Sequence, residues 1–509
     1  MKPVVTGKEM KKIDTYTIEH IGIPSMVLME RAACGLAERM KAHIGRADPV
    51  LCVCGAGNNG GDGVAAARIL FCQGYSAGFY MAGNPEKWTE ETKKQIQIAR
   101  NAGVSEYNEL DLGHVRVVVD ALFGIGLSSP VREPYGEIIR KMNQWRAENR
   151  GVQIWSADIP SGVSSDTGRI LGDGVCADYT VTFGYLKRGL ILYPGREMAG
   201  RCFVEDIGFP QKALKENFPS GFTCDVRDFK QLPERKNDSN KGTYGKILII
   251  AGSKNMSGAA GFAGKAAYYT GAGLVRILTE EANRVILQTA LPEAMLSVWE
   301  ETDAETLKGI LDWADAIVIG PGIGKSRRMA ERMEQVLKMA DKPLVIDADG
   351  LNLLAEHAAW YAFLPQSTVL TPHMGEMSRL TGTPVDVLKR DRAAFAEIFA
   401  EKHHVLCVLK DSSTVISDGR RTCFNRSGNH GMATGGSGDV LAGMIGALMG
   451  AGADGFSAAC TGVFLHGMAG DSASDACSAR GMTASDLVDH LRKVLKLTEN
   501  RNRGCDKSE

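Results

Sequence analysis

The sequence predicts an α/β protein in which two α/β sandwiches follow one another along the chain. Its 509 residues exceed the usual size of a single domain. In both halves, short β-branched runs alternate with helical patterns, as expected of sheets whose strands are joined by helices. Glycine contributes 59 residues, a larger share than the roughly 7% of average proteins. These glycines gather in short loops between apolar runs, which is typical of nucleotide-binding α/β folds.

The first half begins with helices and continues as a parallel, doubly wound sheet. Residues 7–41 have an apolar helical stripe that is interrupted at Gly22–Pro24. Because the strands that follow are separated by helical patterns, parallel pairing is expected. The pattern lapses near residue 208, and we place the first domain at 1–210. Its strands are expected at 50–54, 76–81, 115–119, 152–157 and 179–183.

A polar segment rich in turn-forming residues, Leu232–Gly242, separates the two halves. We therefore expect a linker at 211–240, a second α/β domain at 241–495 and a charged tail at 496–509. The apolar run 440–453 is too short to span a bilayer and is interpreted as a buried helix. Strands of the second domain are expected at 247–251, 274–279, 316–319, 344–347, 368–370, 405–409 and 414–416.

Charge and cysteine usage narrow the classes of function. Lys and Arg total 59 against 60 Asp and Glu, without a block of like charge, so neither nucleic acid nor a membrane is expected as a partner. The N-terminus lacks the apolar segment of a signal peptide. Twelve scattered cysteines form no disulfide framework, which favours the cytoplasm. Cys52 and Cys54 are interpreted as core residues; the alternative is a metal or redox pair, but no second Cys/His pair completes a zinc set.

A glycine-rich loop and polar strand ends predict a site in the first half. The first expected strand runs into Gly55–Gly63, whose glycines and helix-start amides can hold a phosphate. Asp120 and Asp158 follow two other strands, and the carboxyl ends of parallel strands converge on one crevice. With Asn59 and Ser161 they form an oxygen-rich pocket suited to a hard cation, with one carboxylate free for proton transfer. The alternative is that both aspartates only cap turns.

An ordinary NAD dehydrogenase is a weaker interpretation of the same loop. Gly55, Gly57 and Gly60 match the spacing of the dinucleotide fingerprint. The next strand, however, ends in Met81–Gly83 and lacks the acidic residue that binds the ribose.

Residues 1–210 resemble the NAD(P)H-hydrate epimerase family over their whole length. The matching segments are Ile13-Asp14, Met29–Ala32, 58–63, Asp120–Gly126, Asp158–Gly162 and Lys187–Leu190. The resemblance implies a Rossmann-like three-layer sandwich and an isomerase that inverts C6 of hydrated NADH and NADPH. Inversion requires C–O cleavage and re-addition, or ring opening and closure, and a carboxylate that shuttles a proton serves either route.

The resemblance also implies roles for individual residues. Asn59, Asp120 and Ser161 would hold a potassium ion, and the catalytic Asp158 would contact the hydrated nicotinamide. Two loops would cradle the phosphates of the hydrated cofactor. The first consists of Asn58, Asn59, Gly60, Gly61 and Asp62, and the second of Gly124, Ile125, Gly126, Leu127, Ser128, Ser129 and Pro130.

In the second half, Gly435–Gly438 and Asp439 begin an apolar helix. Amides of such a turn point toward an anion, and an aspartate at the helix start can accept a proton from an attacking hydroxyl. The alternative is that Asp439 only caps the helix. Further glycine-rich or polar motifs follow other strands, and there is no Walker sequence. These motifs are Gly320–Gly324, Asp347–Asn352, Thr371–Glu376 and Lys410–Thr414.

Residues 241–495 resemble the ADP- or ATP-dependent NAD(P)H-hydrate dehydratases, which have a ribokinase-like α/β fold. The resemblance implies a lyase that needs Mg²⁺, phosphorylates the C6 hydroxyl with Asp439 as the catalytic base, and then loses phosphate, with AMP formed from ADP. It places the hydrate against Ala259, Gly324, His373 and Asp439. It places the adenine nucleotide against Lys410, Asp411, Ser412, Ser413, Thr414 and Gly438.

The chain departs from the family pattern at three places near the nucleotide. Met374 stands where proline is usual, Asn429–Met432 reads Asn-His-Gly-Met in place of Asn-Pro-Gly-Met, and Asp411 replaces a common glycine. None of these changes removes a group with a proposed chemical role, but they bear on nucleotide affinity and on the choice between ADP and ATP. His373 has a second interpretation, since a histidine after Thr-Pro can simply cap a turn.

Two competing functions follow from the same residues. A kinase of a small alcohol would leave phosphate on its product, and an N-terminal binding module would not need Asp158. Apolar helices in both halves favour a homo-oligomer, without a readable interface.

Overall fold

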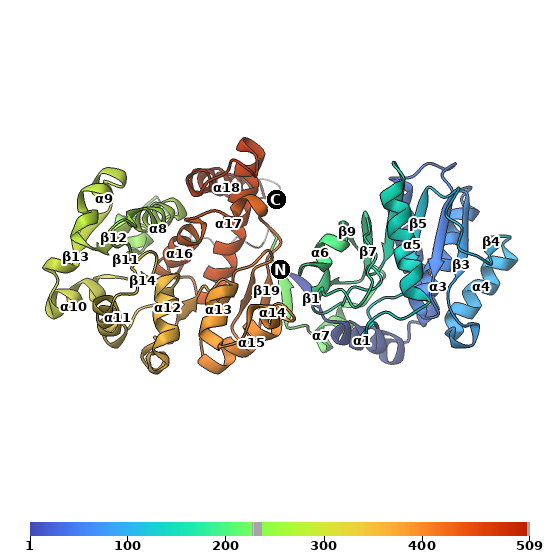
Figure 1. Ribbon diagram of the computed structural model, residues 1–509, viewed down its shortest axis with the longest axis horizontal. Coiled ribbons are helices and arrows are strands. Elements are labelled where there is room, and N and C mark those ends of the chain that lie inside the picture. Colours follow the sequence, from blue (N-terminus) through green and yellow to red (C-terminus); the bar gives the residue numbers. More distant parts are fainter. Residues whose placement is uncertain (226–227, 229–236, 506–509) are drawn as a thin grey trace. The chain divides into compact units, whose positions relative to one another are not determined.

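The computed structural model describes residues 1–225, 228 and 237–505, with side chains up to residue 497. The chain divides into two compact units, each with its own central sheet (Figure 1). One unit is Pro3–Phe222, and the other is Met1–Lys2 together with Thr223–Glu509. Residues 226–227 and 229–236 of the expected linker, and 506–509 of the expected tail, lie outside the described residues.

The N-terminal unit contains a seven-stranded parallel sheet of order β4-β3-β2-β5-β6-β7-β9. The chain winds outward from β2 in one direction and from β5 in the other, so the topological switch point lies between these two strands. Ligands of open α/β sheets bind at such a point, beyond the carboxyl ends of the strands. The strands are β2 (Val50–Cys54), β3 (Ala77–Met81), β4 (Ser105–Tyr107), β5 (Val117–Ala121), β6 (Gln153–Ala157), β7 (Tyr179–Phe183) and β9 (Arg201–Glu205).

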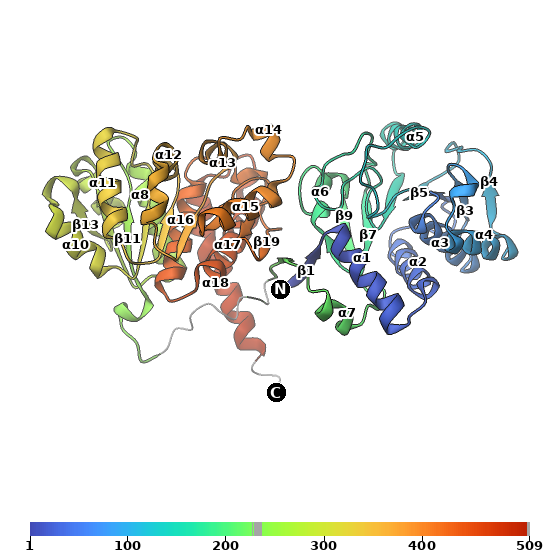
Figure 2. The same cartoon turned by 90° about the horizontal axis from the view of Figure 1, so that it is seen from below.

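Helices cover both faces of this sheet, and the alternation of strand side chains decides which core each residue joins. Cys52 and Cys54 pack with α2 (Ser25–Lys41), α3 (Asn58–Cys72) and α4 (Glu90–Asn101) in one cluster, whereas Leu51 and Val53 pack with α5 (Tyr135–Glu148) in another. Figure 2 shows α5 on the opposite side of the sheet from α2 and α3. The unit is therefore a three-layer sandwich, and both cysteines are core residues. A short parallel pair, β1 (Lys2–Val5) with β8 (Leu186–Lys187), was not expected.

Two boundaries near the expected site differ from the sequence prediction. Helix α3 begins at Asn58 and not after Gly63, so the predicted loop forms the first turns of the helix. This early start is possible because Gly60 has no Cβ, which would lie 1.9 Å from the Gly55 carbonyl oxygen. Asp120 lies inside β5 and does not follow it.

The C-terminal unit has a mixed sheet whose strands are parallel from β13 to β17 and antiparallel at β18 and β19. The order is β13-β12-β11-β14-β15-β16-β17-β18-β19. The strands are β11 (Lys246–Ile250), β12 (Leu274–Thr279), β13 (Met295–Val298), β14 (Ala316–Ile319), β15 (Leu344–Ile346), β16 (Thr368–Leu370), β17 (Leu406–Leu409), β18 (Val415–Ser417) and β19 (Thr422–Phe424).

The helices of this unit form two layers (Figure 1). One layer contains α8 (Ser257–Thr270), α16 (Ser437–Gly450), α17 (Gly455–Cys477) and α18 (Ala484–Cys505). Helix α16 is almost wholly buried, as predicted for the apolar run. Among the described residues, no helix has the length and apolar character needed to cross a membrane. The other layer contains α10 (Ala304–Trp313), α11 (Arg327–Met339), α12 (Asp349–Glu356), α13 (Met374–Thr381) and α15 (Arg392–His403).

Short elements complete the two units. Additional helices are α1 (Gly7–Tyr16), a π-helical turn (Thr17–Ile21), α6 (Gly195–Met198), α7 (Gln211–Glu216), α9 (Arg284–Ala290) and α14 (Val385–Leu388). Single 3₁₀ segments lie at Pro85–Lys87, Arg188–Leu190, Lys241–Tyr244, Glu281–Asn283, Trp299–Glu301, Ala358–Phe363 and His430–Met432. Strand β10 spans Gly221–Thr223.

Candidate active sites

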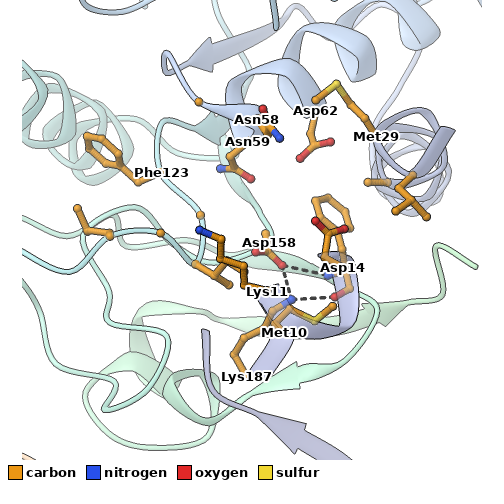
Figure 3. Close-up of a pocket in the computed structure, with 18 of the residues that line it drawn as sticks. Met10, Lys11, Asp14, Met29, Asn58, Asn59, Asp62, Phe123, Asp158 and Lys187 are labelled. Carbon is orange, nitrogen blue, oxygen red and sulfur yellow. Dashed lines mark hydrogen bonds and ion pairs between the residues drawn. The ribbon is translucent and has the colours of Figure 1, made fainter. Parts of the chain in front are cut away.

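A cavity of about 550 Å³ opens at the switch point of the N-terminal sheet (Figure 3). Its walls come from α1, α2, the start of α3, the loop after β5 and the ends of β6 and β7. Most residues predicted to bind the hydrated cofactor line this cavity: Asn58, Asn59, Asp62, Gly124, Ile125, Gly126, Leu127, Ser128, Ser129 and Asp158.

Gly60, Gly61 and Pro130 are not among the lining residues. Gly60 and Gly61 are buried behind the cavity wall. A Cβ on Gly61 would lie 2.8 Å from the Met29 Cε atom, so this glycine permits α3 to pack against α2. In the structure, Gly60 and Gly61 allow the start of α3 to pack closely against its neighbours.

Asp158 is held in an unusual conformation at the end of β6. Its φ of 67° lies in the left-handed region that non-glycine residues rarely adopt, and its side chain is almost fully buried. The Oδ1 atom accepts hydrogen bonds from Lys187 Nζ at 2.5 Å and from the Phe183 amide at 3.1 Å. The second oxygen, Oδ2, accepts none from the described residues, so it remains free to act on a ligand in the cavity.

Lys187 is a further candidate site residue, which sequence reasoning did not single out. Its side chain is 1% exposed, and Nζ also donates to Thr182 Oγ1 at 2.9 Å and to the Phe183 carbonyl at 2.8 Å. A lysine is rarely buried unless it is paired, and here its charge is matched by Asp158. In the sequence, Lys187–Leu190 stands out only as a segment that matches the family. The signal that could have indicated a buried, paired lysine is a charged residue inside an apolar run.

Two further carboxyl groups face the same cavity, Asp62 from α3 and Asp14 from α1 (Figure 3). Burial raises the pKa of Asp62 well above its usual range, and the charges of Asp158 and Asp14 raise it further. Burial also raises the pKa of Asp14. The cavity therefore combines an ion-paired carboxylate, Asp158, with a carboxyl group, Asp62, whose protonated form is favoured by burial and by the neighbouring charges. This pairing of an acid with a base is typical of proton-transfer sites.

The residues predicted to hold potassium meet just behind the cavity. Asp120 is fully buried and accepts hydrogen bonds from Ser161 Oγ at 2.5 Å, the Ser161 amide at 2.8 Å and Ser156 Oγ at 2.8 Å. Burial raises its pKa. The Phe123 amide donates to Ser161 Oγ at 2.9 Å, and a Cβ on the next residue, Gly124, would lie 3.4 Å from Asn59 Oδ1.

This donor set fits a hard monovalent cation. A cation would offset the charge of Asp120, which no basic side chain among its hydrogen-bond partners balances. Asn59 Nδ2 is buried and has no acceptor among the described residues. Since the amide oxygen and nitrogen are assigned from hydrogen bonding, the reversed orientation would turn the Asn59 carbonyl oxygen to that place as a ligand.

The second site lies at the carboxyl edge of the C-terminal sheet. Asp347 follows β15 and Lys410 follows β17; Lys410 Nζ donates to Asp347 Oδ1 at 2.6 Å. Thr371, after β16, donates to the same oxygen at 2.7 Å. A Cβ on Gly438 would lie 3.2 Å from Lys410 Nζ, so the glycine-rich helix start and this ion pair adjoin one another.

Asp439 is the third residue of α16 and does not cap it. The N-cap is Gly436, with a φ of 90°, and no side chain caps this helix. Burial raises the pKa of Asp439 to about 7, and the nearby charge of Asp347 adds to the effect while Lys410 opposes it. A carboxyl group with this pKa accepts a proton readily near neutral pH.

His466 positions this helix start, although no motif in the sequence marks it. Burial lowers its pKa to about 4, so the ring is neutral. Its Nε2 donates to the Ser437 carbonyl oxygen at 2.9 Å. The twelfth residue of α17 thus fixes the turn next to Asp439, a link that only the folded chain reveals.

His373 does cap a helix, as its second interpretation held. Its Nδ1 accepts from the amides of Gly375 at 3.0 Å and Glu376 at 3.3 Å at the start of α13. The ring is 54% exposed, and burial of the rest lowers its pKa. Its Nε2 lies 3.3 Å from Glu376 Oε1, so the ring contacts the first turn of α13 through both nitrogens. Burial raises the pKa of Glu376 beside it to about 7.

The remaining predicted residues are spread around the same edge. The Gly324 amide donates to Asp349 Oδ2 at 3.0 Å. Ala259 lies in the first turn of α8, where a Cβ on Gly322 would approach it to 2.9 Å. In the segment 410–414, Ser412 is exposed, Ser413 is buried and Thr414 is half-buried.

The Asp411 side chain forms an ion pair within the protein. It accepts from Arg392 Nε at 2.5 Å, and this pair is largely buried. The residue that replaces a common family glycine is therefore neutralised by α15. Its charge is compensated before any nucleotide arrives.

The structure defines an α/β enzyme with a carboxylate site in each of two units and a glycine-rich, kinase-like helix start in the second. Family models match both halves: "YjeF-related protein N-terminus" over residues 25–189 and "NAD(P)H-hydrate dehydratase" over residues 247–493. The chain is 38% identical to the bifunctional NAD(P)H-hydrate repair enzyme Nnr of Thermofilum pendens, over 97% of this chain and 96% of that protein. It belongs to the family of bifunctional NAD(P)H-hydrate repair enzymes.

Solved structures match the C-terminal half. A ribokinase-like superfamily protein of Enterococcus faecalis is 27% identical, covering 55% of this chain and 97% of its own, with a TM-score of 0.50. The ADP/ATP-dependent NAD(P)H-hydrate dehydratase of Bacillus subtilis, co-crystallised with ATP and Mg²⁺, is 35% identical over 54% of this chain and 96% of its own, with a TM-score of 0.48. The ribokinase-like fold and the family expected from the sequence are confirmed.

Proposed function

We propose that this chain repairs hydrated NADH and NADPH in two reactions. Residues 1–210 interconvert the R and S hydrates, and residues 241–495 dehydrate the S hydrate with ADP or ATP. The products are the reduced dinucleotide, phosphate and, from ADP, AMP. The observation that carries this proposal is that a chain matched by a repair enzyme over 97% of its length has a carboxylate suited to proton transfer in each unit, Asp158 and Asp439.

The cavity chemistry suits inversion at C6. The hydroxyl leaves more readily when it takes a proton, and water returns from the other face when its proton is removed. Burial and the neighbouring charges favour the protonated form of Asp62, which can donate its proton, and Asp158 Oδ2 is free to accept one. Amides at the start of α3, including that of Asn58, and the loop Gly124–Ser129 are suited to the phosphates.

We infer that Asn59, Asp120 and Ser161 hold K⁺. The bound cation would supply a fixed positive charge beside the loop that faces the phosphates. Asp120 stays buried and anchors Ser161, and through Ser161 it orients the amide of Phe123 at the head of that loop. The fit rests on the oxygen donors and on the buried Asn59 amide described above.

Replacing K⁺ with a larger organic cation, such as choline, should slow epimerisation by about tenfold or more. Ser161→Ala should raise the K⁺ concentration for half-maximal rate. Ser156→Ala is the matched control, because it also removes one hydroxyl from Asp120 but none from the proposed ligands. Interconversion of the R and S hydrates, followed by chromatography, is the measurement. Equal rates in K⁺ and choline would refute the assignment.

In the C-terminal unit, the residues support phosphoryl transfer followed by elimination. Asp439 takes the proton of the C6 hydroxyl as the oxygen attacks the terminal phosphoryl group, while Lys410 and the amides at the start of α16 stabilise its charge. Phosphate then leaves C6, and loss of a proton from C5 restores the ring double bond. Mg²⁺ would neutralise charge on the nucleotide phosphates. Asp347 fits its binding, because Oδ2 accepts no hydrogen bond from the described residues.

The dehydratase should depend on pH through Asp439. Its pKa of about 7 means that the base form is lost as the pH falls below 7. We expect kcat/KM for the S hydrate to fall about tenfold per pH unit below 7 and to level off above it. The measurement is initial rate from pH 5 to 9 at low substrate concentration. A profile that is flat down to pH 5 would exclude Asp439 as the base.

The function is tested with an equilibrated mixture of both NADHX epimers, K⁺, Mg²⁺ and either ADP or ATP. The proposal expects complete recovery of the reduced-nicotinamide absorbance, with one phosphate released per turnover, and the active nucleotide identifies the donor. Recovery that stops with one epimer left would refute epimerisation. A stable phosphorylated product without released phosphate would indicate a small-alcohol kinase.

A further inference from the structure

Three cysteines that are far apart in the sequence meet inside the C-terminal unit. Cys224 follows β10, Cys423 is the middle residue of β19 and Cys460 lies in α17. Their Sγ atoms all lie within 4.8 Å of one another, and Cys224 and Cys423 are separated by 3.6 Å. All three side chains are buried and free of disulfides. No short spacing in the sequence indicates this set, because its three cysteines belong to separate elements.

The geometry of the cluster suits a metal ion better than a disulfide. A disulfide requires sulfur atoms about 2.05 Å apart, much closer than the 3.6 Å observed between Cys224 and Cys423. With zinc–sulfur bonds of about 2.3 Å, two sulfur atoms of a tetrahedral site lie about 3.8 Å apart. The 3.6 Å between Cys224 and Cys423 is close to this value, and the third sulfur, within 4.8 Å of both, is near enough to join the same ion. A set of thiolates selects soft cations such as Zn²⁺ over Mg²⁺ or K⁺.

We propose that Cys224, Cys423 and Cys460 form a binding site for one thiophilic d¹⁰ metal ion of the Zn²⁺ class, held by three thiolates with the fourth position left to water. Neither proposed reaction uses these residues. The site is structural: it ties the chain just after β10 to β19 and to α17. The three cysteines come from the segment after β10, a strand and a helix, so the ion joins elements that only the fold brings together.

The site also adjoins the segment proposed for the nucleotide. Cys423 pairs with Ile416 of β18, and the Asn425 amide donates to the Thr414 carbonyl at 3.0 Å. A metal on Cys423 would therefore restrain the β18–β19 hairpin that follows residues 410–414. Bound metal should raise the thermal stability of the full chain without being required for phosphoryl transfer.

The test uses the full chain, purified without chelators or an affinity tag and kept reduced. Zn²⁺, and separately Cd²⁺, is added in slight excess, unbound metal is removed by gel filtration, and metal per chain is measured by mass spectrometry. We expect about one ion per chain, a sulfur-to-cadmium charge-transfer band, and a higher Tm. In Cys224→Ser the metal affinity should fall by more than about tenfold.

Matched controls keep the test decisive. Cys407→Ser removes a cysteine that is equally buried in β17 of the same unit and should retain the ion. Cys224 is the most exposed of the three, at 9%, so Cys224→Ser should disturb folding least, and circular dichroism verifies its fold. The proposal would be overturned if the wild type bound no metal, or if the wild type and Cys224→Ser bound equal amounts. As a further test, the reduced chain is exposed to air with and without metal, and free thiols are then alkylated. Formation of a Cys224–Cys423 disulfide to the same extent in both samples would also overturn the proposal.

Discussion

Asp439→Asn is expected to abolish dehydration while leaving epimerisation intact. The change keeps the shape of the side chain and removes the proton acceptor at the start of α16. General bases of this kind contribute about 10²–10⁴-fold to rate, and we expect a loss in that range. The measurement is kcat for recovery of NADH from the S hydrate, with R–S interconversion recorded in the same sample. Asp312→Asn, an exposed change in α10, is the control.

The stability of Asp439→Asn separates a chemical role from a structural one. Because the Asp439 carboxyl has a pKa raised from 3.8 to about 7 in the folded chain, folding is favoured when it is protonated and becomes less favoured as the pH rises through this range. The asparagine variant lacks this penalty. Its Tm should exceed that of the wild type at pH 8 and match it at pH 4. A variant that is less stable at pH 8 and retains more than a tenth of the activity would contradict the assigned role.

Lys187→Met is expected to remove epimerase activity and to destabilise the N-terminal unit. It leaves Asp158 nearly buried without its counter-ion, and breaking a buried ion pair in this way costs about 3–5 kcal/mol. The measurements are the free energy of unfolding in denaturant and the rate of R–S interconversion. Lys212→Met, an exposed change in α7, is the control.

A double variant sharpens this prediction. Lys187→Met combined with Asp158→Asn removes both charges, so stability should recover relative to Lys187→Met alone. Epimerase activity should not recover, because the proton acceptor is gone. If the double variant is as unstable as the single one, the ion pair is not the source of the loss. If it regains activity, Asp158 does not transfer the proton.

The sequence predicted the central strands well because their composition decides them locally. Tyr179–Phe183 and Leu274–Thr279 are apolar or β-branched runs next to turn-forming residues, and the structure has strands with these bounds. Strand β4 is only Ser-Glu-Tyr and β8 only Leu-Lys. Such short strands exist because a distant partner offers hydrogen bonds, so local patterns could not reveal them.

The candidate sites were predictable where a motif announces them. The loop at 58–63 and Asp158 follow apolar runs, Asp439 lies between a glycine-rich turn and an apolar run, and all three carry glycine or carboxylate signatures. Lys187 and His466 act through contacts made across the fold, and a buried lysine or histidine has no distinctive neighbours in the sequence. The start of α3 was misplaced because glycines, read as a loop, are here required by close packing against Gly55.

Each proposed site draws its residues from one unit alone. A consequence concerns dosage. Were the two units encoded as separate proteins, their amounts would vary with the expression of each. The reaction catalysed by the scarcer protein would then limit the repair. Joined in one polypeptide, they are made in a fixed ratio of one to one and are degraded together. The balance between interconverting the epimers and consuming one of them is then set by the two rate constants and is independent of how much enzyme the cell makes.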